Sequence, residues 1–428
     1  MKKIWQKAAA LFVCAILVTA AAAAGGSGET KSGDSTVKIW ISAGAEDNIY
    51  RDMFRQISAD TGISIKDEYY PKDELNNKLQ LAPVVGDAPD VIVLDGLDVA
   101  YYYDVGMIEN IDSRVSPDLR RDLMQSVIDE STYDGKLHAV AQFDSGMAMW
   151  ANKSMLQKAG VRIPVSYKEA WNKAEFEDAL AKLKASGVKF PLYIRQNNPS
   201  SLYFTYLPVV RSFGGDFLNR NTMLAEGTLN GQNTVAAYRY MAWLGDQGYM
   251  NPLCDYEDGF YGRKESALSL VGHWKYTDHV NGLGDDAILV PIPDFGHGVF
   301  TGSGSVVWVM STSATENGKA DASWKVMEAA LQPKYINMVT DFNGAIPSRL
   351  SILNSKDEFK PGARLYLYRE QLEAGISYLR PLTPAHMTIW SAVRDATTDI
   401  LVGEDAQKAL DDAARSTDAI IKENGWNK

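Results

Sequence analysis

The sequence predicts an α/β protein built as two domains or lobes, on two observations. The chain has 428 residues, which is more than one hydrophobic core usually supports. Its first hundred residues also alternate between strand patterns, at 37–41, 63–65 and 89–95, and helix patterns, at 47–60 and 72–81. Strand, helix and strand in close succession form a right-handed βαβ unit with parallel strands. We therefore expect a parallel sheet flanked by helices in this region.

Each of these elements has its own sequence signal. Ile49, Met53 and Ile57 recur at four-residue spacing, which places them on one face of a helix. Gly62 follows where a helix C-terminal glycine belongs. The strand at 89–95 is apolar almost throughout, as central parallel strands are. Further along, strands are expected at 267–271, 287–290 and 305–310, and helices at 175–186, 234–247, 320–331, 362–374, 386–402 and 404–423.

The charge balance excludes two classes of partner. The chain has 43 Lys and Arg against 54 Asp and Glu, a formal net charge of −11. Nucleic-acid binding needs a basic surface, and so does attraction to an anionic membrane. Neither is expected as the main partner.

The N-terminus has the layout of an export signal. Residues 1–24 run from a lysine-rich start through an apolar middle to a small-residue end. Residues 25–36 are rich in Gly, Ser and Thr, which predicts a flexible tether. Bacterial lipoproteins carry a lipid-modified Cys at this junction, but Ala24 stands there and Cys14 comes too early. We expect an exported protein at the extracellular face of the cell membrane or in the periplasm, whose lipid anchor is either absent or has lost its Cys.

The sequence contains none of the common catalytic or metal-binding motifs. There is no G-x-S-x-G, Walker loop, H-E-x-x-H or G-x-G-x-x-G after a strand. His273 and His279 are six apart, which fits neither helical nor hairpin zinc spacing. Cys254 is the single Cys after the signal, so no internal disulfide is expected. We predict no metal, no cofactor and no enzymatic activity.

Aromatic residues recur at the predicted ends of strands and the starts of loops. A sugar ring has an apolar face edged by hydroxyls, so it packs on aromatic rings while carboxylates and amides bind the hydroxyls. Asp95 and Asp144 lie just past apolar runs, near such aromatics. For any one of these residues core packing is the better interpretation, but the group together favours a binding cleft. The aromatic residues are Trp40, Tyr69, Tyr70, 101–103, Phe143, Tyr203, Trp274, Trp308 and Trp390.

Trp274 is the first choice for a ligand-stacking residue. It follows the apolar run 267–271 and Gly272, so it lies just past the end of a predicted strand. Open α/β sheets bind their ligands at that edge. The polar segment 275–281 is expected to form a short helix, and the run that ends in Pro293 to lead back toward the first lobe.

Several passages, in order, resemble one family across nearly the whole chain after the signal. They are VKIWISAG, DTGISI, GDAPDVIVLDG, VGMIENID, DGKLHAVAQFDSGMAMWANKSMLQKAGV, LYFTYLPVVRSFGGDF, ESALSLVGHW, LVPIP, GSVVWVM, ASWKVMEAAL, GAIPSR and MTIWSAVRDATTDILVGEDAQKALDDA. The chain resembles the carbohydrate-type extracellular solute-binding proteins of bacterial ABC transporters, the group of the maltose/maltodextrin-binding protein. That member has a Trp in the strand where this chain has VIVLD, which argues against maltodextrin itself.

The resemblance implies a type II periplasmic-binding-protein fold. In it two lobes, each a mostly parallel sheet flanked by helices, enclose a ligand cleft. The implied first lobe is 37–143 with 295–344, and the second is 144–294 with 345–428. Together, the matching motifs and the aromatic pattern predict the ligand-binding residues Trp40, Ser42, Tyr70, Asp95, Asp144, Tyr203, Trp274, Trp308, Arg349 and Trp390.

The implied function is that of a monomeric receptor, which captures a carbohydrate by lobe closure and delivers it to permease subunits. The first alternative keeps the fold but binds a solute such as a glycerol phosphate, for which Arg195, Arg349 and Arg380 are the candidate ligands. The second alternative is a secreted glycoside-active enzyme, for which Asp285-Asp286 and Asp357-Glu358 are carboxylate pairs without supporting context.

Overall fold

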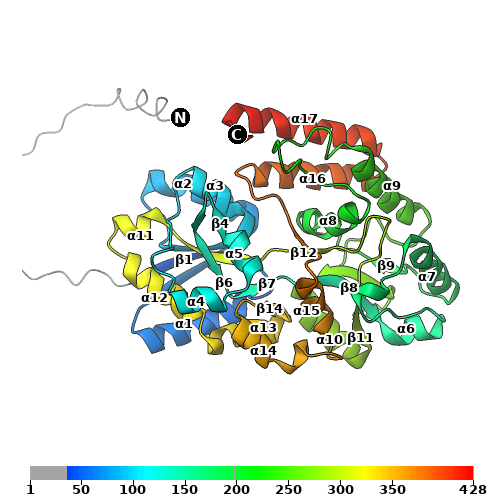
Figure 1. Ribbon diagram of the computed structural model, residues 1–428, viewed down its shortest axis with the longest axis horizontal. Helices are drawn as coiled ribbons and strands as arrows, with labels where there is room; N and C mark the ends of the chain where they lie inside the picture. Colours follow the sequence, from blue (N-terminus) through cyan, green and yellow to red (C-terminus); the bar gives the residue numbers. More distant parts are fainter. Residues whose placement is uncertain (1–35, 197, 428) are drawn as a thin grey trace, which may run out of the picture. The chain divides into compact units, whose positions relative to one another are not determined.

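A computed structural model describes residues 36–196 and 198–427 (Figure 1). The predicted signal peptide, 1–24, and all of the predicted tether except Thr36 lie outside the described residues.

The first sheet has five strands and is mixed. Parallel pairs join β1 to β2 and to β3, while β13 runs antiparallel between β3 and β6. Four of its five strands therefore run in the same direction, as expected for a mostly parallel sheet, and β13 runs in the opposite direction between β3 and β6. In spatial order the strands are β2 (Ile65–Tyr70), β1 (Val37–Ser42), β3 (Val91–Asp95), β13 (Val306–Met310) and β6 (Ala139–Ala141).

Side-chain alternation distributes the strand residues between two helical layers. Ile39 and Ile41 belong to one core with α1, α12 and α13, whereas Trp40 belongs to the other with α2, α3 and α5. Gly62 ends α1 as predicted, with φ 71° and its N–H bound to the Ser58 carbonyl. The helices around this sheet are α1 (Asp47–Thr61), α2 (Lys72–Val85), α3 (Val99–Asp104), α4 (Pro117–Asp122), α5 (Gln125–Ser131), α11 (Thr312–Glu316), α12 (Ala320–Ala330), α13 (Pro333–Asn343) and α14 (Leu350–Ser355).

The second sheet has four strands and is also mixed. Its central strand β8 is antiparallel to both β11 and β10, and β9 runs parallel to β10. In spatial order the strands are β11 (Ala287–Val290), β8 (Met147–Asn152), β10 (Leu268–Gly272) and β9 (Leu192–Tyr193).

Helices cover both faces of this sheet as well (Figure 1). Met149 and Leu270 pack with α7, α8, α9, α16 and α17, while Trp150 and Val271 pack on the opposite side, with α10. The helices are α6 (Lys153–Lys158), α7 (Lys173–Ala185), α8 (Leu202–Ser212), α9 (Gln232–Asp246), α10 (Tyr276–Leu283), α15 (Tyr366–Glu373), α16 (His386–Leu401) and α17 (Ala406–Asn424).

Most predicted elements are present within two residues of the predicted ends. The structure confirms α7, α9, α12, α16 and α17 at that accuracy. The helix expected at 275–281 is α10, and a 3₁₀ turn (His273–Lys275) precedes it. Eight of the described α-helices had no prediction: six of them have seven residues or fewer, and the two longer ones are α8 and α13. Nearly every residue of α8 is buried, so the helix lacks the polar stripe that marks amphipathic helices.

Three segments carry the chain between the two sheets. The first links β6 to β8 and contains β7 (Phe143–Asp144); the second links β12 (Thr301–Ser303) to β13; the third contains β14 (Ile346–Pro347). β7 pairs with β14, and β12 pairs in parallel with β15 (Ser377–Leu379). A further small pair joins β4 (Thr132–Tyr133) to β5 (Lys136–Leu137). The crossing segments are therefore ordered by sheet pairing.

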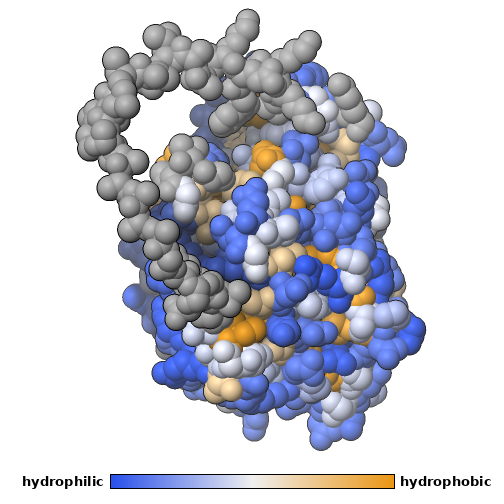
Figure 2. All heavy atoms as spheres, turned by 90° about the vertical axis from the view of Figure 1, so that its left-hand side faces the viewer, coloured by the Kyte–Doolittle hydropathy of each residue, from blue (hydrophilic) through white to orange (hydrophobic). Residues whose placement is uncertain are grey.

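Hydrophilic residues cover most of the face seen in Figure 2, where hydrophobic residues form small separate patches. Such scattered apolar residues are normal for a water-facing surface. Within 36–196 and 198–427, no helix combines the length and the apolar character needed to cross a membrane.

Replacing Trp308 tests the core of the five-stranded sheet. Its side chain is 1 % exposed and packs against Tyr50 and Phe54, with ring centroids 6.1 and 5.6 Å away. We expect Trp308→Ala to lower the free energy of unfolding by about 3–5 kcal/mol, because the change leaves a cavity. Urea denaturation followed by circular dichroism measures it. As the control, Leu253→Ala removes a side chain that is 69 % exposed and should cost less than about 0.5 kcal/mol; equal losses in the two variants would contradict the assignment.

Candidate functional site

A cavity of about 730 Å³ is lined by strand residues of the five-stranded sheet and by residues that follow a strand of the four-stranded sheet. Ser42 ends β1 and Asp95 ends β3, while His273 and Trp274 directly follow β10. Ligands of open α/β folds bind outside the carboxyl ends of strands, and the volume lies within the usual range for small-molecule sites, about 300–1,000 Å³. We therefore take this cavity as the candidate ligand site.

Trp274 presents a partly exposed indole to the cavity. Its ring neighbours are His273 and Phe204, with centroids 5.4 and 5.8 Å away. The backbone of Gly272 passes so close that a Cβ there would lie 2.2 Å from the indole. The ring can occupy this position only because residue 272 has no side chain.

Trp390 also lines the cavity, but two cationic side chains lie over its ring. The Lys72 ammonium and the Arg394 guanidinium lie 5.1 and 4.9 Å from the ring centroid. The side chain is 5 % exposed. Of the two tryptophans, Trp274 therefore has the ring more accessible to a ligand.

Asp95 forms the centre of an ion-pair cluster in the cavity wall. Arg380 donates two parallel hydrogen bonds to it, of 3.0 and 2.9 Å, and the Lys72 ammonium lies 3.5 Å away. Burial opposes ionisation of Asp95, but the Arg380 guanidinium and the Lys72 ammonium hold the pKa of this carboxyl well below its usual range. Asp95 is thus ionised and neutralised by its neighbours.

A second ion-pair cluster surrounds Glu257. Lys275 donates to Glu257 at 2.6 Å and to Asp278 at 2.9 Å, and Arg195 also pairs with Glu257. Burial acts to raise the pKa of Glu257, but Lys275 and Arg195 outweigh it and lower the pKa to about 2. In this part of the wall two cations, Arg195 and Lys275, therefore face two carboxylates, Glu257 and Asp278.

Every lysine and arginine of the cavity lining has a carboxylate partner. Lys72 and Arg380 pair with Asp95, and Arg195 and Lys275 pair with Glu257. The lining contains four cationic residues and four carboxylates, namely Lys72, Arg195, Lys275, Arg380, Glu46, Asp95, Glu257 and Asp278. The formal charges of these eight side chains sum to zero, and burial raises the pKa of the Glu46 carboxyl above its ordinary value.

Three buried nitrogens of the cavity lining have no hydrogen-bond partner among the described residues. They are Nδ1 of His273 and the Nε atoms of Arg195 and Arg380. Burial lowers the pKa of His273 to about 3, so its imidazole is neutral at physiological pH. Unsatisfied buried polar atoms cost about 1–3 kcal/mol each, and none of these three atoms is exposed to the cavity in this conformation.

Two buried carboxyls lie behind the cavity wall at the second crossing segment. Glu130 accepts from the Ser305 N–H at 2.7 Å and from its hydroxyl at 3.0 Å, while Asp144 accepts from the Gly304 N–H at 3.2 Å. Burial, reinforced by the Asp144 charge, raises the pKa of Glu130 to about 8. Glu130 therefore holds its proton at neutral pH.

The cavity brings together four of the ten predicted ligand-binding residues: Ser42, Asp95, Trp274 and Trp390. Three other predicted residues pack in the core. Trp40 is 2 % exposed and packs with residues of α2, Tyr203 of α8 stacks on Phe217 beyond that helix, and Trp308 lies in the core described above. The aromatic pattern selected them because strand aromatics and cleft aromatics look alike in sequence.

The remaining three predicted residues have other partners. Tyr70 donates its hydroxyl to Glu68 on β2. Asp144 is 1 % exposed and holds the crossing segment at Gly304. Arg349 donates to Asp122 at 2.7 Å and to the Leu331 carbonyl at 3.0 Å. None of the three lines the cavity.

Sequence reasoning missed several residues of the wall. Lys72, Glu257 and Lys275 had no prediction, and Arg195 and Arg380 were considered only for a phosphate ligand. Lys275 carried a usable signal, since it directly follows Trp274. Arg380 carried none, because its partner Asp95 is 285 positions away.

Comparison with known proteins identifies the family. Residues 52–363 match the model of the bacterial extracellular solute-binding proteins. The chain belongs to this family. Its members are binding proteins rather than enzymes, and the family name implies export.

Relatives and solved structures share the fold at low identity. The maltotriose-binding protein of Pyrococcus abyssi is 22 % identical over 350 residues, which are 77 % of this chain and 69 % of that protein. The GacH receptor of Streptomyces glaucescens, solved unliganded and with acarbose, superposes with a TM-score of 0.74 at 22 % identity, covering 91 % of this chain and 98 % of that one. The maltose/maltodextrin-binding domain MalE of Bdellovibrio bacteriovorus, bound to maltotriose, gives 0.76 at 18 % identity, with 90 % and 100 % covered. The two-lobe α/β fold of this solute-binding protein is thereby confirmed.

The protonation of Glu130 predicts how stability depends on pH. Its pKa is about 8 in the folded protein against an ordinary value of 4.5 for a glutamate carboxyl. Between these values the unfolded chain has lost the proton that the folded protein keeps, so rising pH favours unfolding. This contribution is fully present below about pH 4.5 and is lost by about pH 8, a change on the order of a few kcal/mol.

Glu130→Gln reproduces the protonated side chain, since its amide keeps an acceptor for the Ser305 N–H and a donor for its hydroxyl. We expect the urea midpoint of the wild type to fall between pH 5 and 8 and that of the variant to fall much less. Equal pH slopes in the two proteins would contradict the assignment of the proton to Glu130.

Proposed function

We propose that this solute-binding protein captures a neutral carbohydrate, an oligosaccharide, by closing its two lobes, and delivers it to the permease subunits of an ABC importer. It acts as a monomer and carries out no chemistry on the ligand. The observation that carries the proposal is the cavity itself, which combines the accessible ring of Trp274 with a densely polar wall whose formal charges sum to zero.

Sugar chemistry fits this combination. The apolar face of a pyranose packs on an aromatic ring, and its hydroxyls both donate and accept hydrogen bonds. In the cavity lining, the side chains of Ser42, Ser145 and Asn198 both donate and accept, and the carboxylate oxygens of Asp278 accept. Solved structures of the same fold contain maltotriose and acarbose, which supports the sugar class and leaves the particular sugar to experiment.

The pairing of the cations argues against the glycerol phosphate alternative. A phosphate would have to take Arg380 from Asp95 or Arg195 from Glu257, leaving that carboxylate with one cation, Lys72 or Lys275, in place of two. Breaking a buried ion pair on one side costs about 3–5 kcal/mol. A neutral ligand leaves both clusters intact.

Closure would take place at the crossing segments. The β7–β14 pair and the contact of Asp144 with Gly304 hold these segments together. Lobes of this kind close by hinge rotation at a few residues while the sheets stay rigid. Part of the ligand's binding energy is then used to shift the population toward the closed form.

Isothermal titration calorimetry against a panel of sugars tests the ligand class. The panel should contain maltose, maltotriose, cellobiose, xylobiose, a uronic acid disaccharide and glycerol 3-phosphate. We expect binding to at least one neutral oligosaccharide and none to the two anions. Binding to glycerol 3-phosphate alone would overturn the proposal, and chromatography that finds shortened sugars after incubation would favour the enzyme alternative.

Trp274→Ala should weaken binding of the best neutral sugar by about ten-fold or more, which is ~1.4 kcal/mol, because the stacking surface is lost. Gly272→Ala should weaken it as well, since the new Cβ would lie 2.2 Å from the indole and displace it. Trp308→Phe is the matched control, because that indole packs away from the cavity. Unchanged affinity in Trp274→Ala, with a normal circular dichroism spectrum, would return Trp274 to a packing role.

A further inference from the structure

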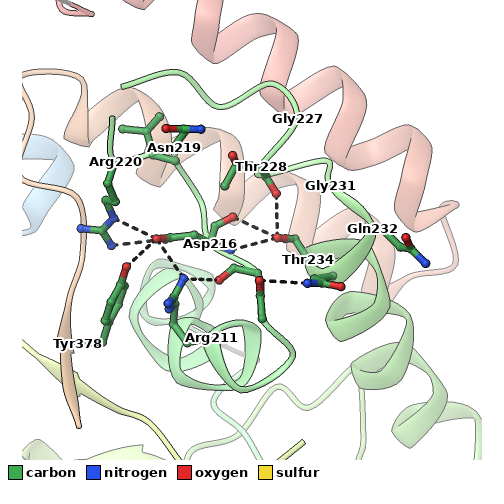
Figure 3. A pocket seen from close by; sticks show the side chains of 14 residues that line it. Arg211, Asp216, Asn219, Arg220, Gly227, Thr228, Gly231, Gln232, Thr234 and Tyr378 are labelled. Carbon is green, nitrogen blue, oxygen red and sulfur yellow. Dashed lines mark hydrogen bonds and ion pairs between the residues drawn. The ribbon is translucent and has the colours of Figure 1, made fainter. Parts of the chain in front are cut away.

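A second pocket of about 480 Å³ lies beside the start of α9, and Asp216 is at its centre (Figure 3). Its side chain is 7 % exposed. Figure 3 shows Arg211, Arg220 and Tyr378 all pointing toward this carboxylate. The arrangement raises the question of what a buried carboxylate does outside the ligand cavity.

The carboxylate of Asp216 is fully engaged. Arg220 donates to it at 3.0 and 3.4 Å, the Tyr378 hydroxyl at 2.9 Å and the Phe217 N–H at 2.7 Å. Arg211 lies 3.5 Å away. The Tyr378 ring is packed between the two guanidinium groups, 4.1 and 4.7 Å from its centroid. Because these groups already satisfy one another, the pocket is better explained as an anchor than as a second ligand site.

The anchored element is β15. Tyr378 is its middle residue, and Arg220 also donates to the carbonyl of Leu379, its last residue, at 2.9 Å. β15 is short and pairs with β12 alone among the described strands. Asp216 therefore fixes both the side chain and the backbone of a strand that sheet pairing holds on one edge.

The residue that follows β15 is Arg380, which enters the ligand cavity and forms the two parallel hydrogen bonds to Asp95. Asp95 in turn accepts from the N–H of Leu97 at 3.1 Å. A continuous series of contacts thus runs from Asp216 through β15 and Arg380 to Asp95, at the end of β3 in the five-stranded sheet.

We propose that Asp216 is a positioning residue for ligand binding. It holds β15 so that Arg380 meets Asp95 and keeps the cavity wall neutral, although Asp216 itself does not line that cavity. Without its charge, the two arginines repel each other, β15 loosens and Arg380 no longer meets both oxygens of Asp95. The wall then presents an imperfectly paired carboxylate to a neutral sugar. This inference rests on the proposed function for its ligand but not for its geometry.

Hydrogen exchange of the unliganded protein tests the geometry. Asp216→Asn keeps the shape and removes the charge, and Tyr378→Phe removes one donor. We expect faster exchange at 377–380 and at the Leu97 N–H, with a smaller effect for Tyr378→Phe. Asp90→Asn is the matched control, because Asp90 is also buried, accepts from the Lys38 N–H at 2.8 Å and pairs with Lys319 at 3.4 Å. Unchanged exchange at Leu97 in Asp216→Asn would overturn the proposal.

Calorimetry with maltotriose, or with the panel sugar that binds best, tests the consequence. We expect Asp216→Asn to lower affinity about five-fold, a size typical of residues that act at a distance. Asp90→Asn should change it by less than about two-fold. In an Arg380→Met background, Asp216→Asn should add little. An equal loss of affinity in Asp90→Asn would show that Asp216 only stabilises the fold in general. If the wild type binds no sugar, the proposed function is contradicted, but the hydrogen-exchange test of the geometry remains valid.

Discussion

The ion pair between Arg380 and Asp95 is the contact on which the rest of the cavity depends. Removing two charges from water is costly and is repaid only when the geometry is good and the remaining hydrogen-bonding capacity is used. Here the guanidinium donates two parallel bonds, and Lys72 and the Leu97 N–H occupy further positions on the carboxylate. The pair joins Asp95, at the end of β3 in the five-stranded sheet, to Arg380, which directly follows β15. It thereby fixes part of the spacing across the cavity.

Burial accounts for the proton on Glu130, and the two members of the ion pair act on its pKa in opposite directions, since Asp95 raises it and Arg380 lowers it. Asp95, Asp144 and Glu130 lie around the second crossing segment, and the Arg380 guanidinium makes its hydrogen bonds to Asp95. Arg380 lowers the pKa of Glu130 less than burial and Asp144 raise it. Keeping Glu130 neutral is the cheaper solution for a fully buried carboxyl beside another carboxyl. Asp95, which lines the cavity, is therefore charged, whereas Glu130, which binds the backbone of Ser305, is neutral.

The fold could be predicted from the sequence, but the site could be predicted only in part. Helices such as α1 and α17 have a clear apolar stripe and ends marked by Gly62 and Gly425, signals that are local. The sequence did not predict α8, because burial on all sides removes the alternation of apolar and polar faces that marks a helix. The cavity wall escaped for another reason, since pairs such as Arg380 with Asp95 join residues far apart in sequence. Nothing near Arg380 indicates that its partner is a strand-end carboxylate.

The aromatic residues show where local reasoning reaches its limit. Trp40 and Trp308 lie inside strands, where alternation turns each side chain toward one of the helical layers, and both are buried there. Trp274 lies two residues beyond the end of β10, on a 3₁₀ turn that no longer obeys that alternation. Gly272 then allows its ring to lie against the backbone at the strand's end and face the cavity. A tryptophan that follows a strand-ending glycine is therefore better placed to meet a ligand than a tryptophan within the strand, because its ring is not committed to either helical layer.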